Sequence, residues 1–412
     1  MALSPSDRGT LRSLASRLAQ IAASDEQQQL AEQWRDLNGL RPTRPLVRIF
    51  QIPWNEFAQE DKLQLTCEDP WAREVENGLR MALYQHDHMR DDFVFDPVMS
   101  CALAVSDSGF GVGGVFDRPE GEGSVRFHGQ IKDLDDVQRI QFPTISHDKH
   151  ATEQRFQQLS ELFEGIMPVK MRGISHYWFA PWDVLIQWYG IETAMLDMVL
   201  RPDLVNAAMS RLVDAYLHRL DQWEQLNLLA LPDMGTGVGS GGLGLTDELP
   251  QSDCDPAHVR PTDLWGCATP QIFSEVSPAM HEEFALQHEL RWLERWGLNY
   301  YGCCEPLHTK IGILKQVPRL RKISCSPKAD KVSMAEQCGT DYVISLKPNP
   351  AIFAGSYWDP EVARRELRED LEKLRGCIVE IVLKDISTVS FQPQRLHLWA
   401  QIAREEAERF VS

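Results

Sequence analysis

Hydrophobic and polar positions change period along this chain, and the changes predict helices alternating with strands. Residues 5–38 carry Leu11, Leu14 and Leu18 at helical spacing and predict a helix. Residues 46–52 form a compact apolar run that ends at Pro53, which predicts a strand. Further apolar runs of similar length predict strands at 92–101, 167–175, 227–234, 298–304, 321–326, 341–347 and 377–386.

The order of these elements predicts an α/β fold. Helical patterns occupy residues 277–297, 361–375 and 393–410 between or after the strands. About eight strands alternating with helices predict a (β/α)8 TIM barrel over residues 45–412, preceded by an N-terminal helical extension over residues 1–44. A doubly wound open sheet is the alternative. Its dinucleotide-binding form is disfavoured because no Gly-x-Gly-x-x-Gly follows an early strand.

Two long inserts, residues 106–165 and 235–276, interrupt the regular spacing. On a barrel we expect such loops to lie over the catalytic face. The second insert contains a glycine-rich run, residues 235–244, whose backbone N–H groups could cradle an anion. The run lacks the Lys-Ser/Thr ending of a phosphate-binding loop, so we expect a flexible lid.

Composition narrows the class of protein. The chain has 412 residues, is 43% hydrophobic and carries a formal net charge of −18. This charge disfavours nucleic acid or an anionic membrane surface as a partner. No signal-peptide pattern or membrane-length apolar run is apparent. The nine cysteines form no spaced disulfide framework. We therefore expect a cytoplasmic protein that acts on a small molecule.

Reactive side chains recur where predicted strands end, which is where barrels perform chemistry. Asp96, Glu305, Lys347 and Asp385 are the predicted catalytic residues. Each has a structural alternative as well. A carboxylate at a strand end often caps the next helix, and Lys347 could simply pair with a carboxylate. Several such ends together favour a functional site over any one of them alone.

The segment Asn299–His308 holds two thiols, a carboxylate and an imidazole. Cys303, Cys304 and His308 are the predicted metal ligands, since thiolates and imidazole suit a soft metal such as zinc. Alternatively, the cysteines are ordinary buried residues, and a pair on a strand would point to opposite faces.

A second group of residues predicts the wall of a cofactor pocket. His176 and Trp182 belong to an aromatic run just past a predicted strand, and Asp233 ends the next one. For Asp233, capping of a helix is an equal alternative. The remaining histidines that we considered are expected at the surface: His86, His88, His281 and His288.

The ordered segments resemble the uroporphyrinogen decarboxylase superfamily, which includes cobalamin-linked zinc methyltransferases. The resemblance covers roughly residues 45–410. It rests on the first-strand segment 44–53, Phe95-Asp-Pro97, Phe179-Ala-Pro-Trp182, the helix at 277–284 and Cys303-Cys304-Glu305. It implies that Asp96 corresponds to the decarboxylase's catalytic aspartate. It also implies that Cys304 corresponds to a zinc-binding cysteine, and that homodimers form.

Departures from the family pattern narrow the function. Residues 51–56 read Gln-Ile-Pro-Trp-Asn-Glu, without the arginines that grip the many carboxylates of uroporphyrinogen. Uroporphyrinogen itself is therefore not the expected substrate. Gly302 stands where the family has a zinc-binding histidine, and Asp385 stands near the position of its second cysteine. The zinc site of the family is therefore either formed by different ligands in this chain or lost.

We expect a methyltransferase of a corrinoid-dependent demethylation or methyl-transfer system. It would move a methyl group between a methylated corrinoid and a thiol or folate acceptor, with zinc assistance. The chain lacks the corrinoid-binding Asp-x-His-x-x-Gly sequence, so the corrinoid would arrive on a separate protein. One alternative is a metal-free decarboxylase or lyase that uses Asp96 and Lys347 on a small carboxylic acid. Another is a non-catalytic barrel that binds a small molecule.

Overall fold

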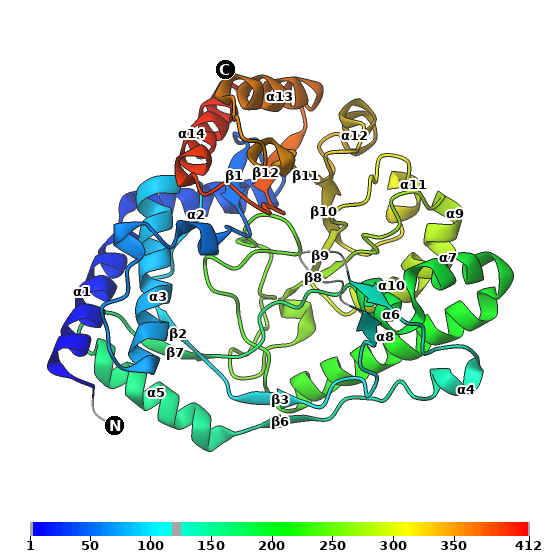
Figure 1. Ribbon diagram of the computed structural model, residues 1–412, viewed down its shortest axis with the longest axis horizontal. Helices are drawn as coiled ribbons and strands as arrows, with labels where there is room; N and C mark the ends of the chain where they lie inside the picture. The colour runs from blue at the N-terminus through cyan, green and yellow to red at the C-terminus, as the bar shows by residue number, and fades with distance from the viewer. Residues whose placement is uncertain (1–2, 118–124, 411–412) are drawn as a thin grey trace.

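The fold is α/β, with helices arranged around a central parallel sheet (Figure 1). The computed structural model describes residues 3–117 and 125–410. The central sheet has six strands in the order β1-β12-β11-β10-β9-β8, and every neighbouring pair is parallel. These strands are β1 (Leu46–Ile49), β8 (Trp265–Ala268), β9 (Leu298–Tyr301), β10 (Leu320–Cys325), β11 (Val343–Leu346) and β12 (Ile378–Leu383).

Burial on both faces explains why the strands read as continuous apolar runs. All residues of β1, β8, β9, β11 and β12 are buried. Helices provide the outer cover: α3 (Pro70–Tyr84), α6 (Pro181–Tyr189), α8 (Pro202–Gln225), α9 (Pro278–His281), α10 (Gln287–Leu293), α11 (Ile311–Leu314), α12 (Lys331–Cys338), α13 (Pro360–Lys373) and α14 (Pro393–Phe410). The predicted start of the helix at Ser277 is confirmed, because its side chain accepts a hydrogen bond from the Met280 N–H.

The hydrogen-bonded sheet is not closed into a barrel. Strands β2 (Met99–Ala102) and β7 (Val169–Arg172) form a separate parallel pair. The predicted strand at 227–234 was wrong: only a single parallel bridge joins Ile174 to Leu229. Pro232 follows soon after, and proline cannot donate to a strand ladder. Conversely, β8 lies inside the predicted insert at 235–276, where Trp-Gly-Cys-Ala is too short an apolar run to stand out.

The N-terminal helical prediction is confirmed as two helices rather than one. They are α1 (Pro5–Ala22) and α2 (Asp25–Asn38), and Ser24 between them caps α2 by accepting from the Gln27 N–H. Trp34 of α2 is fully buried, and its indole N–H donates to the Asp92 carbonyl at 2.7 Å. Helix α2 packs against β1 and β12 of the central sheet.

The glycine-rich run does not form the flexible lid that its composition predicted. Residues 238 and 240–244 are buried, and the segment passes through the middle of the ring of elements (Figure 1). The Gly242 N–H donates to Glu380 at 2.9 Å, and a Cβ at Gly242 would collide with the Trp34 ring. Glycine is needed here because the backbone approaches other side chains closely. The run thus fills the interior rather than covering it.

The first insert forms a peripheral layer. It contains the antiparallel pairs β3 (Val105–Asp107) with β6 (Ile145–His147) and β4 (Phe116–Asp117) with β5 (Arg126–Phe127). Its helices are α4 (Leu134–Val137) and α5 (Lys149–Phe163). Outside the insert, α7 (Ile191–Leu200) connects α6 to α8. Residues 118–124 of this predicted loop lie outside the described residues. In the described ranges, each helix is too short or too polar to cross a membrane.

Candidate functional site

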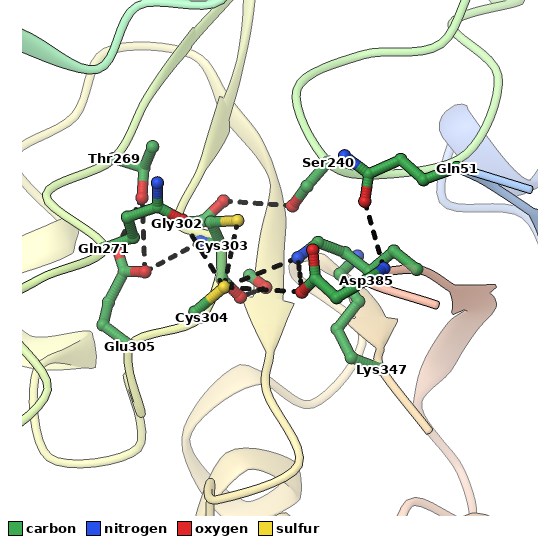
Figure 2. A network of polar contacts seen from close by, with 12 residues as sticks. Gln51, Ser240, Thr269, Gln271, Gly302, Cys303, Cys304, Glu305, Lys347 and Asp385 are labelled. Atoms are coloured by element: carbon green, nitrogen blue, oxygen red, sulfur yellow. Dashed lines mark hydrogen bonds and ion pairs between the residues drawn. The ribbon is translucent and has the colours of Figure 1, made fainter. Parts of the chain in front are cut away.

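The carboxyl ends of β9, β10, β11 and β12 meet around one cavity of about 420 Å³. This is the edge of the sheet at which the sequence predicted chemistry. Figure 2 shows the side chains that gather there, including Cys303, Cys304, Lys347 and Asp385. The cavity is lined by Cys303, Cys304, Pro327, Lys328, Lys347, Pro348, Asn349, Pro350, Lys384 and Asp385.

The two cysteines lie side by side rather than on opposite faces. Their sulfurs are 3.5 Å apart. Strand β9 ends at Tyr301, and Gly302 then adopts a φ of +96°, a left-handed conformation that favours glycine. The turn takes the chain out of the strand pleat before Cys303. Both thiols therefore face the same region, and the strand-pair alternative does not apply.

Lys384 and Asp385 follow β12 and contact Cys304. The Lys384 ammonium lies 3.5 Å from the Cys304 sulfur and is ion-paired with the Asp385 carboxylate. Asp385 Oδ2 is itself 3.6 Å from the Cys304 sulfur. The Asp385 N–H donates to the Gln51 side chain at 3.0 Å, which fixes the turn after the strand. A buried cation is thus held against a thiol.

This cation changes the acidity of the thiol pair. The pKa of Cys303 is lowered, first because the Cys304 thiol donates a hydrogen bond to it and then because the Lys384 charge is close. The pKa of Cys304 is raised by the same hydrogen bond and by burial. Burial opposes the Lys384 charge, but the two cysteines and Asp385 raise the pKa of its ammonium. The pair therefore favours a single thiolate beside a permanent cation.

Lys347 provides a second, differently tuned amine. Burial lowers the pKa of Lys347 to about 7, and its Nζ donates to Ser345 Oγ at 2.5 Å. The nearby Glu380 cannot restore the charge fully, because it is already bonded to Lys322 at 2.8 Å and accepts from Ser345 at 2.6 Å. Lys347 thus lines the cavity as an amine that changes charge near neutral pH.

Glu305 holds the turn rather than lining the cavity. It is fully buried, and its carboxyl accepts from the Cys303 N–H at 2.9 Å and from the Thr269 hydroxyl at 2.9 Å. Burial raises its pKa to about 7. Its contacts fix the backbone that presents the thiols, so its place is that of a positioning residue.

The side chains of this network that escaped the sequence-based prediction include Lys384, Gln271 and Gln51. Lys384 ends a predicted strand, and the strand-end criterion could have selected it along with Asp385. Gln271 Oε1 lies 3.5 Å from the Cys304 sulfur, and the Gln271 amide donates to Asp183. It follows β8, so the undetected strand concealed its position. Gln51 carries no charge or nucleophile that would single it out.

Asp96 and Asp233 lie together in a different cluster. Arg172, at the end of β7, contacts Asp96 at 3.3 Å and is ion-paired with Asp233. The Met234 N–H donates to Asp96 at 3.1 Å, and the Ser100 hydroxyl donates to Asp233 at 2.7 Å. Both carboxylates therefore share one arginine. Neither lines the cavity beside Cys304.

The structure places His176 and Trp182 in the interior. His176 Nε2 accepts from the Gly239 N–H at 3.0 Å, and burial lowers its pKa to about 4. Trp182 is fully buried and donates to the Phe284 carbonyl at 2.9 Å. Among the histidines expected at the surface, His281 is a correction. It is fully buried and contacts the Tyr301 hydroxyl at 2.7 Å.

The predicted metal ligands do not come together as a set. Cys303 and Cys304 are adjacent, but the ring of His308 has a buried Nδ1 without a partner and no hydrogen bond to either thiol. Within residues 3–117 and 125–410, no three His, Cys, Asp or Glu side chains are arranged to hold a metal ion. Lys384 also places a positive charge at the Cys304 sulfur. The side chains as arranged do not fit zinc.

The fold is similar to that of several solved structures. A methyltransferase from Methanosarcina mazei matches with a TM-score of 0.50 and 13% sequence identity, and the match covers 93% of this chain and 99% of that chain. No family model matches the sequence. No curated protein sequence matches it either. At 13% identity the likeness shows a shared fold.

Proposed function

We propose that this chain is a methyltransferase whose reaction takes place in the cavity at the carboxyl ends of β9–β12. The observation that carries the proposal is the pairing of two lysines of opposite character. Lys384 is a fixed cation at a sulfur, and Lys347 has a pKa near 7 in the same cavity. A transfer to a thiol needs these two elements, a proton acceptor and a stabiliser of thiolate. Likeness to the methyltransferase fold supports the same reaction class.

The positions of the side chains support the following reaction. Neutral Lys347 accepts the proton of an acceptor thiol bound in the cavity, and the resulting thiolate lies near the Lys384 ammonium. The thiolate sulfur then forms a bond to the methyl carbon. The bond from methyl to donor breaks, and its electron pair stays with the donor. The buried walls hold both reactants in line and exclude water.

The donor that we propose is a methylated corrinoid carried by a separate protein, as expected from the family resemblance. The described part of the chain forms no three-ligand metal group, so no step of this mechanism uses zinc. Cys303 and Cys304 line the cavity beside Lys384, where a sulfur-bearing acceptor would bind. A folate acceptor would use the same cavity, where neutral Lys347 would accept the proton that the folate nitrogen loses when it is methylated.

We also propose that the architecture is a distorted barrel of the (β/α)8 type, in which irregular segments continue the six-stranded central sheet. Two groups of contacts support this. The Asp92 N–H donates to the Val47 carbonyl at 2.7 Å, which continues the ladder beyond β1. The Ile174 N–H donates to the Leu228 carbonyl at 2.7 Å, and the Ala230 N–H donates to the Ile174 carbonyl at 3.0 Å. These segments would continue the parallel order of the sheet.

The test is methyl transfer from methylcobalamin to 2-mercaptoethanol under anaerobic conditions. Loss of the methyl–cobalt absorbance and formation of the methyl thioether are followed together. We expect the wild-type protein to accelerate both, and Lys347→Met to abolish most of the acceleration. A wild-type rate equal to the rate without protein would contradict the proposal.

A further inference from the structure

The vicinal thiols form a feature that the methyl-transfer proposal does not require. Cys304 is partly exposed to the cavity, whereas Cys303 is 4% exposed behind it. The backbone around them is held on both sides: the Cys303 N–H donates to Glu305 at 2.9 Å, and its carbonyl accepts from Ser324 at 2.8 Å. The two sulfurs are therefore fixed as a pair that opens into a cavity (Figure 2).

The spacing of the sulfurs suits a shared bridging atom better than a disulfide. They are 3.5 Å apart, whereas a disulfide bond is about 2.05 Å long and usually joins Cα atoms at least about 4.4 Å apart. Adjacent Cα atoms lie only about 3.8 Å apart across a trans peptide. Two sulfurs bonded to one soft atom at about 2.3 Å would need a separation close to the observed one.

Charge decides which soft atom fits between them. A metal cation at this position would meet the Lys384 ammonium, which is 3.5 Å from the Cys304 sulfur, and would find no third His, Cys, Asp or Glu ligand among the described residues. A neutral trivalent arsenical avoids both obstacles. It makes covalent bonds to two sulfurs, keeps its carbon or oxygen substituent as the third, and brings no positive charge.

We propose that Cys303 and Cys304 form a dithiol site that captures neutral trivalent arsenicals. With an arsonous acid, R–As(OH)2, two S–As bonds form and two As–O bonds break. The two thiol protons leave with the hydroxyl groups as two molecules of water, and no oxidation state changes. The substituent R projects into the 420 Å³ cavity. This site depends only on the geometry of the thiols, so it stands or falls separately from methyl transfer.

The experiment uses one equivalent of phenylarsonous acid and intact-protein mass spectrometry on the full chain. We expect one adduct per chain that has lost two waters. It should survive excess 2-mercaptoethanol, which offers single thiols, and be removed by 2,3-dimercaptopropanol, which offers two. Cys304→Ser should lose the resistant adduct while its circular dichroism stays that of the folded protein. Cys303→Ser should lose it as well.

Matched controls come from the other cysteines. Cys254→Ser and Cys377→Ser should bind as the wild type does. Cys377 is the sharper control because it is partly exposed and lies near buried Cys338. An adduct that persists in Cys304→Ser, or that disappears in Cys377→Ser, would overturn the assignment. The same applies if a monothiol removes the wild-type adduct.

Discussion

Two polar clusters lie at strand ends in this molecule, and they differ in how their charges are paired. In the first cluster Arg172 is shared by Asp96 and Asp233, with further donors from Ser100 and the Met234 backbone. In the second, around Cys304, three lysines (Lys328, Lys347 and Lys384) line one cavity with two thiols and the exposed carboxylate of Asp385. The first cluster holds both of its carboxylates against one arginine, and the second leaves groups in a cavity available to a ligand.

The difference explains why a reactive residue at a strand end is a weak predictor on its own. Asp96 and Lys347 both follow strand-like segments, yet only Lys347 lines the cavity, where burial lowers its pKa to about 7. The pKa of Lys347 stays low because the nearby Glu380 carboxylate is already paired with Lys322. A functional side chain is therefore recognised by a charge that its neighbours do not pair, and this depends on the folded structure.

The largest expected effect is the loss of methyl transfer when Lys347, in the cluster around Cys304, is replaced. Lys347→Met keeps the length of the side chain but removes the amine, so we expect methyl transfer to fall by about 100-fold or more, the range of a lost general base. Steady-state rates with methylcobalamin and 2-mercaptoethanol measure this. A variant within about threefold of the wild type would remove Lys347 from the mechanism.

The pH dependence sharpens this prediction. With its pKa near 7, Lys347 is neutral only above that pH, so kcat/KM should rise as pH increases through about 7. Stability should also rise with pH between about 7 and 10.5, because the unfolded lysine keeps its proton in that window and the folded one does not. Chemical denaturation across this range should show the rise in the wild type and a flatter curve in Lys347→Met.

In the Arg172 cluster we expect a substitution to lower stability and to leave methyl transfer almost unchanged. Arg172→Met leaves Asp96 and Asp233 close together without their cation, so we expect a loss of roughly 1–3 kcal/mol in the free energy of unfolding. Methyl transfer should stay within about threefold of the wild type. Urea denaturation and the transfer assay measure the two quantities on one preparation. A stable but inactive variant would move the reaction to this cluster.

A smaller effect on kcat/KM is expected when one ion-paired aspartate of each cluster is replaced by asparagine. Asp385→Asn removes the charge that holds Lys384 beside Cys304, and we expect about a tenfold loss in kcat/KM, which corresponds to about 1.4 kcal/mol. Asp233→Asn is the matched control in the other cluster and should change kcat/KM less than twofold. Equal effects of the two substitutions would argue against the distinction between the clusters.

The smallest effect concerns Glu305, the buried carboxyl behind the thiols. Its folded pKa near 7 exceeds the ordinary value of 4.5, so the folded state binds more protons between these two pH values. This contribution to stability is complete below about pH 4.5 and is lost as pH rises through about 7. Glu305→Gln should flatten that part of the stability curve. An unchanged slope would show that the carboxyl is already ionised.

Much of the framework could be predicted from the sequence because burial on both faces leaves an unbroken apolar run. That signal is clear in residues 341–347 and 377–386, which contain β11 and β12. It fails for β8, where Trp265-Gly-Cys-Ala268 is short and contains glycine, and for residues 227–234, which are apolar but form only one bridge.

The candidate site was predictable in part for a similar reason. Strand ends can be read from the sequence, so Cys304, Lys347 and Asp385 could be placed at one edge. Pairing cannot be read in the same way, because it depends on contacts between distant segments. Arg172 reaches Asp233 across 61 positions of sequence, and Gly242 reaches Glu380 across 138. The interior position of the glycine-rich run follows from the same long-range contacts.

The most direct test of the account compares methyl transfer by Lys347→Met and Asp96→Asn in parallel with the wild type. If the cavity beside Cys304 is the reaction site, Lys347→Met should lose about 100-fold or more while Asp96→Asn stays within about threefold. If Asp96→Asn is the damaged variant and Lys347→Met retains its activity, the reaction belongs to the Arg172 cluster and the central claim is wrong.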